Sequence, residues 1–425
     1  MPKTFSIKTL GCKLKQYESP LIATRLTDRG WRAVPFGETA DLVIINTCTV
    51  TDRSDKKCRS YIRQGARFAA GGRVIVTGCL AENRPEELAA MGEVLRVLGN
   101  TGREDLIAFA GEAAGIQEVR PLSAEGESPL PFFHTRGFLK IQDGCDGSCS
   151  YCVVPSVRGL PSSRPLPEIR EHARRLAEAG CPELVLTGIT IGKYLWEGRD
   201  LASLVRELLT LDGVFRIRIT SLEPRHVTPA LREVFSSERV CRHLHLPLQS
   251  GSDRILSLMN RPYSAAEYRR VVRDLKEQVP RLALGTDIII GFPGETAADF
   301  GESLRLAEEC EFSYVHQFTF SPRTGTPAAS MEYGLSRGEL EERGRRMREL
   351  SAAMGLAYRQ GFVGEVLPSV IEKNRGGEGY TAVSDNYIKI HLPDTPGVAV
   401  QSGRIVPVLL REAGPEGNYG VVASG

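Results

Sequence analysis

The sequence predicts an α/β protein made of three folded parts, and three observations support this. Short apolar runs alternate with helix-compatible sequence over residues 1–112 and again over 136–360. Such alternation is typical of parallel sheets flanked by helices. From 361 to 425 short strands are separated by Gly, Asn and Pro turns, which predicts a small all-β domain. The segment 113–135 is rich in Gly, Ser and Pro and is expected to be a linker.

The N-terminal part repeats one pattern three times. Apolar, β-rich runs that start near residues 4, 41 and 73 each lead into a cysteine, namely Cys12, Cys48 and Cys79. Ligands bind outside the carboxyl ends of the strands in open parallel sheets, so the three thiols are expected to converge there. The alternative is three buried core cysteines. The repeated placement favours a shared metal site in an N-terminal parallel-sheet α/β domain.

The second part contains six candidate strands, at 137–142, 183–187, 214–219, 242–247, 284–290 and 313–319. Helical patterns lie between them, at Leu166–Ala179, Leu201–Leu211 and Ala265–Gln278. Six βα units predict a central open partial (βα)6 barrel, with its site at the carboxyl ends of the strands. The charged helix expected at Ser336–Gln360 would leave this barrel.

The last part has candidate strands at Glu365–Ile371, Tyr380–Val383, Asn386–His391 and Arg404–Leu410. They predict a small antiparallel barrel or sandwich. This part is slightly acidic, with five Lys and Arg against seven Asp and Glu. Its charge therefore gives no simple reason for it to bind phosphates.

The bulk composition is that of an ordinary globular protein. The chain is 41% hydrophobic and 25% charged, and its net charge of +2 favours no class of partner. No apolar run approaches the ~18 residues of a membrane helix, and the first residues lack the apolar region of a signal peptide. Ten cysteines are too few for a disulfide scaffold at this length. We therefore expect a cytoplasmic protein whose thiols are reduced and available to metal.

The strongest short motif is a cluster of three cysteines directly after the first strand of the predicted barrel. Cys145, Cys149 and Cys152 have the spacing C-x3-C-x2-C, with no fourth cysteine nearby. Three thiolates can hold a four-iron, four-sulfide cluster by three corners and leave the fourth iron open. Structural zinc sites recruit four ligands, and structural iron–sulfur clusters take four cysteines. The spacing therefore favours an open [4Fe-4S] cluster over a zinc knuckle.

These motifs resemble the methylthiotransferase branch of radical S-adenosylmethionine (SAM) enzymes over nearly the whole chain. The matching stretches are 9–19 (TLGCKLKQYES), 46–51 (NTCTVT), 143–152 (DGCDGSCSYC), 245–253 (HLPLQSGSD), 291–296 (GFPGET) and 321–327 (SPRTGTP). The tail resembles a TRAM domain. Gly-Cys-Lys at 11–13 and the stretch 46–51 are most similar to the MtaB type, which adds a 2-methylthio group to N6-threonylcarbamoyladenosine beside the tRNA anticodon. Lys15 stands where Asn is expected, and 188–194 also departs from the familiar pattern.

The resemblance implies a transferase with two [4Fe-4S] clusters and SAM. SAM would bind the open iron held by Cys145, Cys149 and Cys152, and its reductive cleavage would give a 5′-deoxyadenosyl radical. Radical chemistry is needed because an adenine C2–H bond has no acidity for a general base to use. The second cluster, on Cys12, Cys48 and Cys79, would donate the sulfur.

The partners implied by the resemblance are the tRNA anticodon loop, an external one-electron reductant and a sulfur donor, without a membrane. Sister enzymes that act on isopentenyl-adenosine or on a ribosomal-protein aspartate are alternatives. A non-enzymatic iron–sulfur electron carrier is a third.

Polar and glycine residues at successive strand ends are candidates for SAM contact: Thr187, Gly188, Ser221, Glu223, Gln249, Ser250, Gly291 and Phe292. As single residues each could also cap a turn. Arg261 is a candidate partner of the methionyl carboxylate, the alternative being a surface salt bridge. No catalytic side chain is indicated beyond the cluster ligands.

A basic helix after Cys48 is a candidate RNA-binding surface, the alternative being a solvated charged face. Its cations are Arg53, Lys56, Lys57, Arg63 and Arg67. The remaining cysteines, 58, 181, 241 and 310, follow no ligand spacing and are expected to be structural. His243 and His245 are expected to straddle the sheet.

Overall fold

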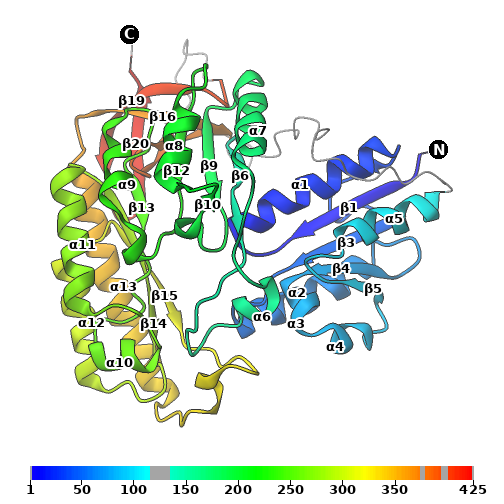
Figure 1. Cartoon of the computed structure of the whole chain (residues 1–425), viewed down its shortest axis with the longest axis horizontal. Coiled ribbons are helices and arrows are strands. Elements are labelled where there is room, and N and C mark those ends of the chain that lie inside the picture. The colour runs from blue at the N-terminus through cyan, green and yellow to red at the C-terminus, as the bar shows by residue number, and fades with distance from the viewer. Residues whose placement is uncertain (1, 115–134, 374–378, 394–400, 424–425) are drawn as a thin grey trace.

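The computed structural model describes residues 2–114, 135–373, 379–393 and 401–423, and most of the expected linker lies outside them. Figure 1 shows an N-terminal α/β part, a central set of parallel strands lined by helices, and a small β part near the C-terminus. The predicted α/β architecture with a closing all-β domain is confirmed. The exact domain boundaries remain a prediction.

The N-terminal part is a five-stranded parallel sheet with the order β2-β1-β3-β4-β5. Its strands are β1 (Thr4–Thr9), β2 (Arg32–Ala33), β3 (Leu42–Thr47), β4 (Val74–Gly78) and β5 (Val94–Leu98). Its helices are α1 (Lys13–Asp28), α2 (Asp52–Ala66), α3 (Cys79–Asn83), α4 (Pro85–Ala89) and α5 (Arg103–Ala114). The three strands that precede the cysteines were predicted; β2, of two residues, and the edge strand β5 were not.

Strands β3 and β4 are buried along their whole length, because helices cover both faces of the sheet. Val43 and Ile45 pack with Ile62 of α2 on one face. Ile44 and Ile75 pack with residues of α1 and α5 on the other. Buried apolar strands of this kind are typical of parallel sheets.

The central part contains six parallel strands in chain order: β6 (Gly137–Lys140), β9 (Glu183–Thr187), β12 (Arg216–Ile219), β13 (His243–His245), β14 (Ala283–Ile290) and β15 (Tyr314–Thr319). They form two three-stranded sheets, joined by isolated bridges from β12 to the residues around β13. The intervening helices are α6 (Val154–Arg158), α7 (Leu166–Glu178), α8 (Leu201–Leu209), α9 (Pro229–Glu233), α10 (Asp253–Leu258), α11 (Ala265–Gln278) and α12 (Ala297–Glu309). The predicted open half-barrel is confirmed.

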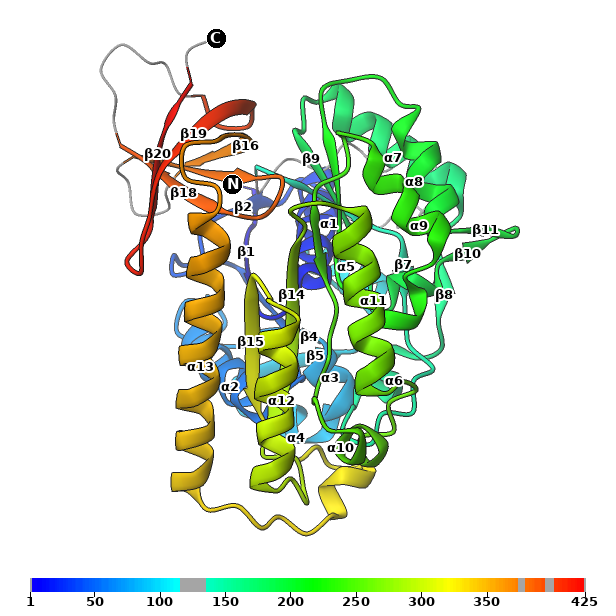
Figure 2. The ribbon, with the colours of Figure 1, turned by 90° about the vertical axis from the view of Figure 1, so that its left-hand side faces the viewer.

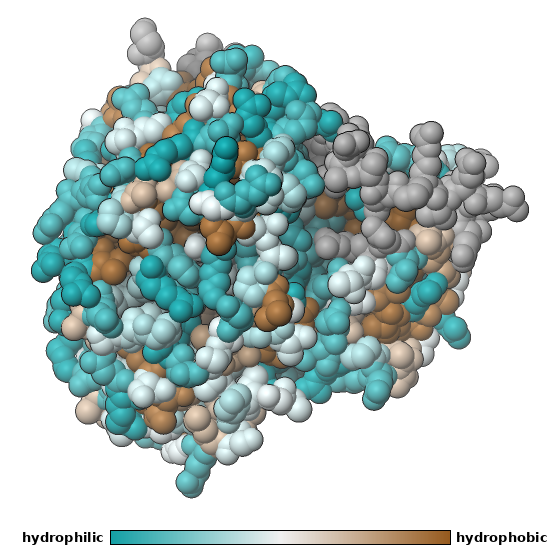
Figure 3. Space-filling view, viewed as in Figure 1, coloured by the Kyte–Doolittle hydropathy of each residue, from teal (hydrophilic) through white to brown (hydrophobic). Residues whose placement is uncertain are grey.

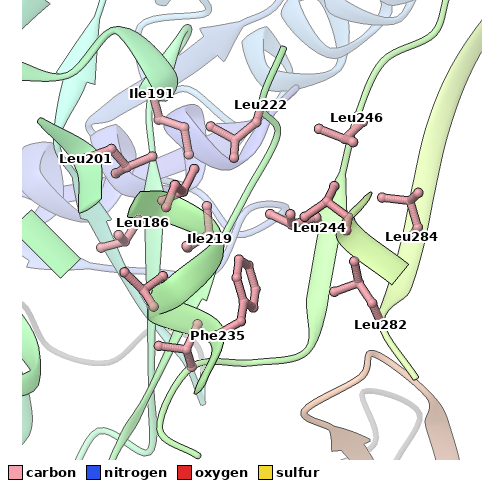
Figure 4. Close-up of a cluster of buried hydrophobic side chains, with 14 of the residues drawn as sticks. Leu186, Ile191, Leu201, Ile219, Leu222, Phe235, Leu244, Leu246, Leu282 and Leu284 are labelled. Carbon is pink, nitrogen blue, oxygen red and sulfur yellow. The ribbon is translucent and has the colours of Figure 1, made fainter. Parts of the chain in front are cut away.

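Alternate side chains of these strands face the helices and form the largest core. Leu186, Ile219, Leu244 and Leu284, from four neighbouring strands, gather in one cluster (Figure 4). Because side chains alternate along a strand, the residues between them face the inside of the half-barrel. We call the inward side chains Arg218, His243, His245, Asp287, Tyr314, His316 and Phe318 the inner wall.

Helix α13 (Arg337–Gln360) packs along β15 beside α12, so the expectation that this helix leaves the barrel is wrong (Figure 2). The side chain of Ser351 accepts a hydrogen bond from the backbone N–H of Val315 at 3.0 Å. Met347 is fully buried in the barrel core, and Leu350 and Met354 pack against it. The charged residues that dominate the sequence of this helix occupy its other faces.

The C-terminal part is a closed barrel with the order β16-β17-β18-β20-β19. Its strands are β16 (Val366–Lys373), β17 (Tyr380–Ser384), β18 (Lys389–Leu392), β19 (Ile405–Ala413) and β20 (Asn418–Val422). Only β20 was not predicted. Arg216 and Arg218 of β12 donate hydrogen bonds to the carbonyls of Pro368, Val383, Ser384 and Asp385, which joins this barrel to the central part.

Shorter elements complete the fold: the two-residue strands β7 (Gln142–Asp143), β8 (Ser162–Ser163), β10 (Leu195–Trp196) and β11 (Arg199–Asp200), and 3-10 turns at 191–193, 224–226, 234–236 and 327–330. The surface seen in Figure 3 is mostly hydrophilic, with hydrophobic residues in scattered groups. Within the described part of the chain, every helix is too short or too polar to span a membrane.

Candidate functional site

The loop that contains Cys145, Cys149 and Cys152 begins at a glycine that the backbone requires. Gly144 has a φ of +75°, and a Cβ there would lie 2.1 Å from the carbonyl oxygen of Leu160. The strands β7 and β8 pair just before and after the loop. The N–H of Cys145 also donates to the carbonyl of Gly159 at 2.9 Å. The base of the loop is therefore fixed by its own flanking residues.

The far side of the loop is attached to the turn after α10. The backbone N–H of Ser150 donates to the carbonyl of Met259 at 3.0 Å, and its hydroxyl donates to that of Leu258 at 2.7 Å. The side-chain amide of Asn260 donates to the carbonyl of Ser148 at 2.9 Å. These bonds hold the three cysteines on a supported loop at the carboxyl end of the half-barrel.

Each of the three sulfur atoms accepts an N–H hydrogen bond. The donors are the backbone N–H of Gly147 to Cys145 (3.2 Å), that of Val154 to Cys152 (3.4 Å), and the Arg261 guanidinium to Cys149 (3.1 Å). Such donors stabilise thiolates and tune iron–sulfur clusters. Burial raises the pKa of the Cys152 thiol to about 12. Metal binding at this loop must therefore displace a proton.

The second cysteine trio converges at the carboxyl edge of the N-terminal sheet. Cys12 precedes α1, Cys48 follows β3, and Cys79 begins α3 after β4. Gly11 allows Cys12 and Cys48 to approach each other. Its φ is +115°, and a Cβ at this position would lie only 3.0 Å from the sulfur of Cys48. Burial, with smaller contributions from Cys12 and Cys79, raises the pKa of Cys48 to about 11. The ligand role of the trio remains a prediction, but its convergence is a property of the fold.

Neither trio is drawn tightly enough to hold one metal ion. A single zinc with Zn–S bonds of about 2.3 Å needs its sulfur ligands within roughly 4.6 Å of one another. Over the residues that the structure describes, only His245, Asp287 and His316 place three such ligand atoms within 4.8 Å of one another. In neither cysteine trio do all three sulfur atoms lie within 4.8 Å of one another.

Arg158, in the short helix α6 that follows the first cysteine loop, contacts the second trio. Its Nε lies 3.3 Å from the sulfur of Cys79, and its Nη1 lies 2.7 Å from Glu18 and 3.3 Å from Asp143. A buried guanidinium from the helix that follows the first cysteine loop thus reaches the sulfur of Cys79 in the second trio. This arginine was not predicted from the sequence. Arg158 and Cys79 are 79 positions apart, and no motif around Arg158 indicates a contact over that separation.

The family departure at Lys15 belongs to the same buried network. The Lys15 ammonium, 1% exposed, binds Glu18 at 2.8 Å and the side-chain oxygen of Asn100 at 2.9 Å. The amide of Asn100 donates to the carbonyl of Val157 at 2.7 Å. Lys15 therefore stabilises the docking of the N-terminal sheet onto α6.

A second contact joins the same two parts through the Ser-Pro-Arg-Thr motif. Arg323 is buried and binds Asp55 of α2 at 2.7 Å and the hydroxyl of Thr49 at 2.6 Å. The hydroxyl of Ser321 accepts from the backbone N–H of Asp52 at 3.0 Å. This motif fixes the start of α2, one turn after Cys48.

The candidate SAM residues of the second and third strands have different environments. Thr187 is buried at the end of β9, and Gly188 follows it. The side-chain oxygen of Gln142, which sequence reasoning did not single out, accepts from the backbone N–H groups of Ile189 (3.1 Å) and Thr190 (2.7 Å) and shapes this turn. Ser221 is exposed at the end of β12.

Buried Arg261 pairs with half-buried Glu223 next to the first cysteine loop. Nη2 of Arg261 lies 3.2 Å from a carboxylate oxygen of Glu223, and the arginine side chain is 4% exposed. Arg261 therefore forms a salt bridge, but its guanidinium lies in the interior and not at the surface, so the surface alternative is wrong. Nη2 has no well-formed hydrogen bond within the described residues, so it remains available to a further acceptor.

The remaining candidates surround the cysteine loop rather than forming a single row. Gln249 has a φ of +71°, and the hydroxyl of Ser250 lies 3.3 Å from that of Ser303 in α12. Gly291 donates its N–H to Glu295 at 2.8 Å. Phe292 packs edge-on against Tyr151, with ring centres 6.4 Å apart. Contact of these residues with SAM stays a prediction; Phe292 supports the loop directly.

The inner wall is polar and was not predicted. His243 and His245 both face inward, and their ring nitrogens lie 2.9 and 3.3 Å from the hydroxyl of Tyr314, so the expectation that they straddle the sheet is wrong. His245 also lies 3.0 Å from Asp287. Burial alone would raise the pKa of Asp287, but hydrogen bonds from His245 and His316 lower it to about 2.

Lys13, next to Cys12, extends toward this wall from the N-terminal part. Its ammonium lies 6.0 Å from the ring centre of Tyr387, a residue of the C-terminal barrel. The Tyr387 ring in turn lies 4.3 Å from that of His243 and 5.0 Å from the Arg218 guanidinium. Burial, then the charge of Arg218, lowers the pKa of Lys13 to about 8.

The five cations of the candidate RNA surface, Arg53, Lys56, Lys57, Arg63 and Arg67, are all exposed. They lie on α2 and its C-terminal end, and Lys56 forms a 2.7 Å ion pair with Asp52. Their role in RNA binding stays a prediction. The cysteines expected to be structural, Cys58, Cys181, Cys241 and Cys310, are all buried.

Two family models match the chain: the radical SAM superfamily over residues 139–307, and the uncharacterized protein family UPF0004 over residues 4–99. The chain is 37% identical to the threonylcarbamoyladenosine tRNA methylthiotransferase MtaB of Bacillus subtilis (strain 168), over 98% of this chain and 96% of that protein. It is 32% identical to the tRNA-2-methylthio-N(6)-dimethylallyladenosine synthase of Erythrobacter litoralis, over 97% and 96%.

A solved structure supports the fold. The radical SAM methyltransferase TsrM from Kitasatospora setae, with cobalamin and a [4Fe-4S] cluster bound, matches 77% of each chain with a TM-score of 0.58 and 16% identity. The superfamily and the relatives together imply SAM and [4Fe-4S] clusters as cofactors. With relatives above 30% identity along almost its full length, the chain belongs to the radical SAM methylthiotransferase family.

Proposed function

We propose that this enzyme inserts a methylthio group at C2 of N6-threonylcarbamoyladenosine beside the anticodon of tRNA. The observation that supports it best is the connection of the two cysteine trios through Arg158, which binds Cys79 from the helix after Cys152. A single radical SAM site explains only the first trio. A reaction that also inserts sulfur explains why a second, neighbouring trio is present. Four relatives named as MtaB, at 34–37% identity, support the choice of substrate.

The residues present fit two clusters. Cys145, Cys149 and Cys152 would hold the one that binds SAM, and Cys12, Cys48 and Cys79 the other. When bound, these groups would supply the hydrogen-atom abstraction that the unactivated C2–H bond requires, and the sulfur for transfer. The three N–H donors to the sulfurs of the first loop would stabilise the thiolates.

The protein's own side chains orient the reactants. The unsatisfied Nη2 of Arg261 offers a buried donor for the methionyl carboxylate of SAM, and Glu223 keeps that guanidinium in place. Phe292 supports the loop by packing on Tyr151. The exposed cations of α2 would contact the phosphates of the anticodon loop, whose bases are open to recognition.

The reaction needs partners beyond tRNA. An external one-electron reductant must deliver electrons to the enzyme, and a sulfur donor must restore what each turnover removes. A tRNA substrate would place the enzyme in the cytoplasm.

A second substrate class has a specific observation in its favour. Relatives of 32–34% identity are named tRNA-2-methylthio-N(6)-dimethylallyladenosine synthase. The corresponding alternative for this chain is isopentenyl-adenosine in tRNA. The ribosomal-protein aspartate and the electron-carrier alternatives lack comparable support.

The proposal is tested with anaerobically reconstituted enzyme, dithionite, SAM and anticodon stem-loop RNAs that carry either modified adenosine. We expect 5′-deoxyadenosine together with the 2-methylthio derivative of the threonylcarbamoyl RNA. Cys145→Ala should abolish SAM cleavage, whereas Cys48→Ala should retain some cleavage and form no methylthio product. Turnover of the isopentenyl RNA alone would transfer the function to the second substrate class. SAM cleavage without methylthiolation of either RNA would refute both.

A further inference from the structure

The inner wall ends, on the side of the N-terminal part, at a lysine that forms no ion pair with any residue the structure describes. Lys13 is half-buried, and within the described residues no carboxylate lies within 4.0 Å of its ammonium. The ring centre of Tyr387 lies 6.0 Å from this ammonium. A cation held at a partly desolvated position without a counter-charge is costly unless a ligand supplies that charge.

The carboxylates of this region are already occupied by other cations. Glu183 binds Arg216 and Arg218, each at 2.7 Å, and lies 3.6 Å from Arg136. The other three acids pair elsewhere: Glu372 with Arg136, Asp385 with Arg242, and Asp287 with His245. Among the residues of this region that the structure describes, Lys13 is therefore a cation whose charge no ion pair within 4.0 Å balances.

Lys13 is the first residue of α1 and directly follows Cys12, a candidate ligand of the second trio. Its ammonium extends from there toward Tyr387 and the inner wall. The neighbouring wall is open to solvent: the side chain of His316 is 61% exposed, and Phe318 is 41% exposed. Both side chains project to the same side of β15 as Tyr314, whose ring lies 6.2 Å from that of Tyr387. A group bound in front of this wall can therefore reach the lysine.

We propose that Lys13 binds the carboxylate of the substrate's threonylcarbamoyl group, with Tyr387 as the adjoining wall, and so selects this substrate over those with a hydrocarbon at N6. The inference rests on the proposed function and deepens it. The threonylcarbamoyl group has a free carboxylate, whereas an isopentenyl group has no charge. An ammonium without an ion pair favours the substrate with the carboxylate, and with the uncharged substrate its partly desolvated charge stays unbalanced.

Substrate esterification provides a direct test. The reconstituted enzyme is given, in competition, two anticodon stem-loop RNAs that carry threonylcarbamoyladenosine either as the free acid or as its neutral methyl ester. The ratio of the two kcat/KM values is then independent of how much of the enzyme is loaded with clusters. We expect the wild type to prefer the acid by at least about tenfold, as for a charge-assisted hydrogen bond.

The same competition is run with variants. Lys13→Met should lower kcat/KM for the acid by that factor and bring the ratio close to one, while Lys13→Arg should keep a preference for the acid. Lys276→Met, which removes an ammonium on α11 that pairs with Glu311, is the matched control and should behave as the wild type. Iron content and 5′-deoxyadenosine formation without RNA are measured alongside for every variant, so that the two kcat/KM values are compared at known cluster loading.

The outcomes separate the alternatives. A wild type that converts acid and ester equally, as it would if Lys13 contacted a phosphate, overturns the inference. So does a Lys13→Met enzyme that turns over both RNAs more slowly but keeps the wild-type ratio, since the lysine would then only balance the charge of the neighbouring cluster. A wild type inactive on the threonylcarbamoyl RNA refutes the proposed function itself, which is a different result from either of these.

Discussion

Nε of Arg158 lies 3.3 Å from the sulfur of Cys79, so a residue of the radical SAM half-barrel donates a hydrogen bond to a candidate ligand of the N-terminal sheet. The guanidinium is 1% exposed and is also bound by Glu18. Its positive charge therefore acts on the second cysteine site with little screening by solvent. This contact makes the electronic properties of one site depend on a side chain that the other loop positions.

Replacing Arg158 by Met should make the second cluster harder to reduce, because a cation near the sulfur stabilises the added electron. We expect its midpoint potential to fall by about 50 mV, measured by redox titration with EPR detection in a Cys145→Ala background. Arg164→Met is the control: it removes another guanidinium that reaches the N-terminal part, at Tyr17, without touching a cysteine. Equal potentials in Arg158→Met and wild type would show that the hydrogen bond has no electronic effect.

The buried pair of Arg323 with Asp55 should be important for stability. Arg323→Met would leave the Asp55 carboxylate, 3% exposed, without its cation, at a cost of about 3–5 kcal/mol in the free energy of unfolding. The double variant Arg323→Met, Asp55→Leu should recover much of the loss. Arg337→Met, which breaks an exposed pair with Glu341, should change stability by less than about 0.5 kcal/mol. Denaturant unfolding of all four proteins measures this, and a double variant less stable than Arg323→Met would contradict it.

His172 should make the fold sensitive to mild acid. Burial on α7, close to Tyr17 and with the charge of Arg164 nearby, lowers its pKa to about 4, below its ordinary 6.5. The unfolded chain therefore binds this proton over a range where the folded protein does not, so stability is lost as the pH falls from 6.5 toward 4. Between pH 7 and pH 5 the loss amounts to about 2 kcal/mol.

The pH dependence is checked by denaturant unfolding of wild type and His172→Gln at both pH values. The variant should lose about 2 kcal/mol less than the wild type over this interval, because glutamine does not titrate. Parallel losses in the two proteins would show that His172 has the same pKa in the folded and the unfolded state, which would contradict the lowered pKa of the folded protein.

The exposed cations of α2 should contribute to tRNA affinity through phosphate contacts. The double variant Arg63→Ala, Arg67→Ala should bind tRNA more weakly. It should also reduce the slope of log K against the logarithm of the salt concentration by about 1 to 2, because each phosphate contact releases counterions. Filter binding at several salt concentrations measures the slope. Arg345→Ala, on the exposed side of α13, is the matched control. An unchanged slope in the double variant would return α2 to the role of a solvated surface.

Much of the fold could be predicted because its strands are buried apolar runs of the right length. Glu183–Thr187 was placed to the residue, and β14 and β15 to within one residue. Strand β2 was missed because two residues leave no periodic pattern. The expectation that α13 leaves the barrel was wrong because the charged residues in its sequence outnumber the few apolar ones that pack on β15.

The cysteine positions could also be predicted, because each follows a strand or lies within a dense motif. The connecting side chains could not. Arg158, Arg323 and Lys13 act across distances of tens to hundreds of residues along the chain, and single basic residues have no spacing that marks such contacts. The two histidines of β13 were misplaced since residues i and i+2 of a strand share a face, which the fold makes the inner wall.

The most direct measurement is anaerobic iron and sulfide analysis, with Mössbauer spectra, of the wild type and of variants that lack one trio. Two separate clusters predict about eight irons and eight sulfides per chain in the wild type, and about four of each when Cys12, Cys48 and Cys79 are replaced by Ala or when Cys145, Cys149 and Cys152 are. Two results would contradict the presence of two clusters. One is a wild type that holds about four irons, and the other is a spectrum that does not change when Cys145, Cys149 and Cys152 are replaced.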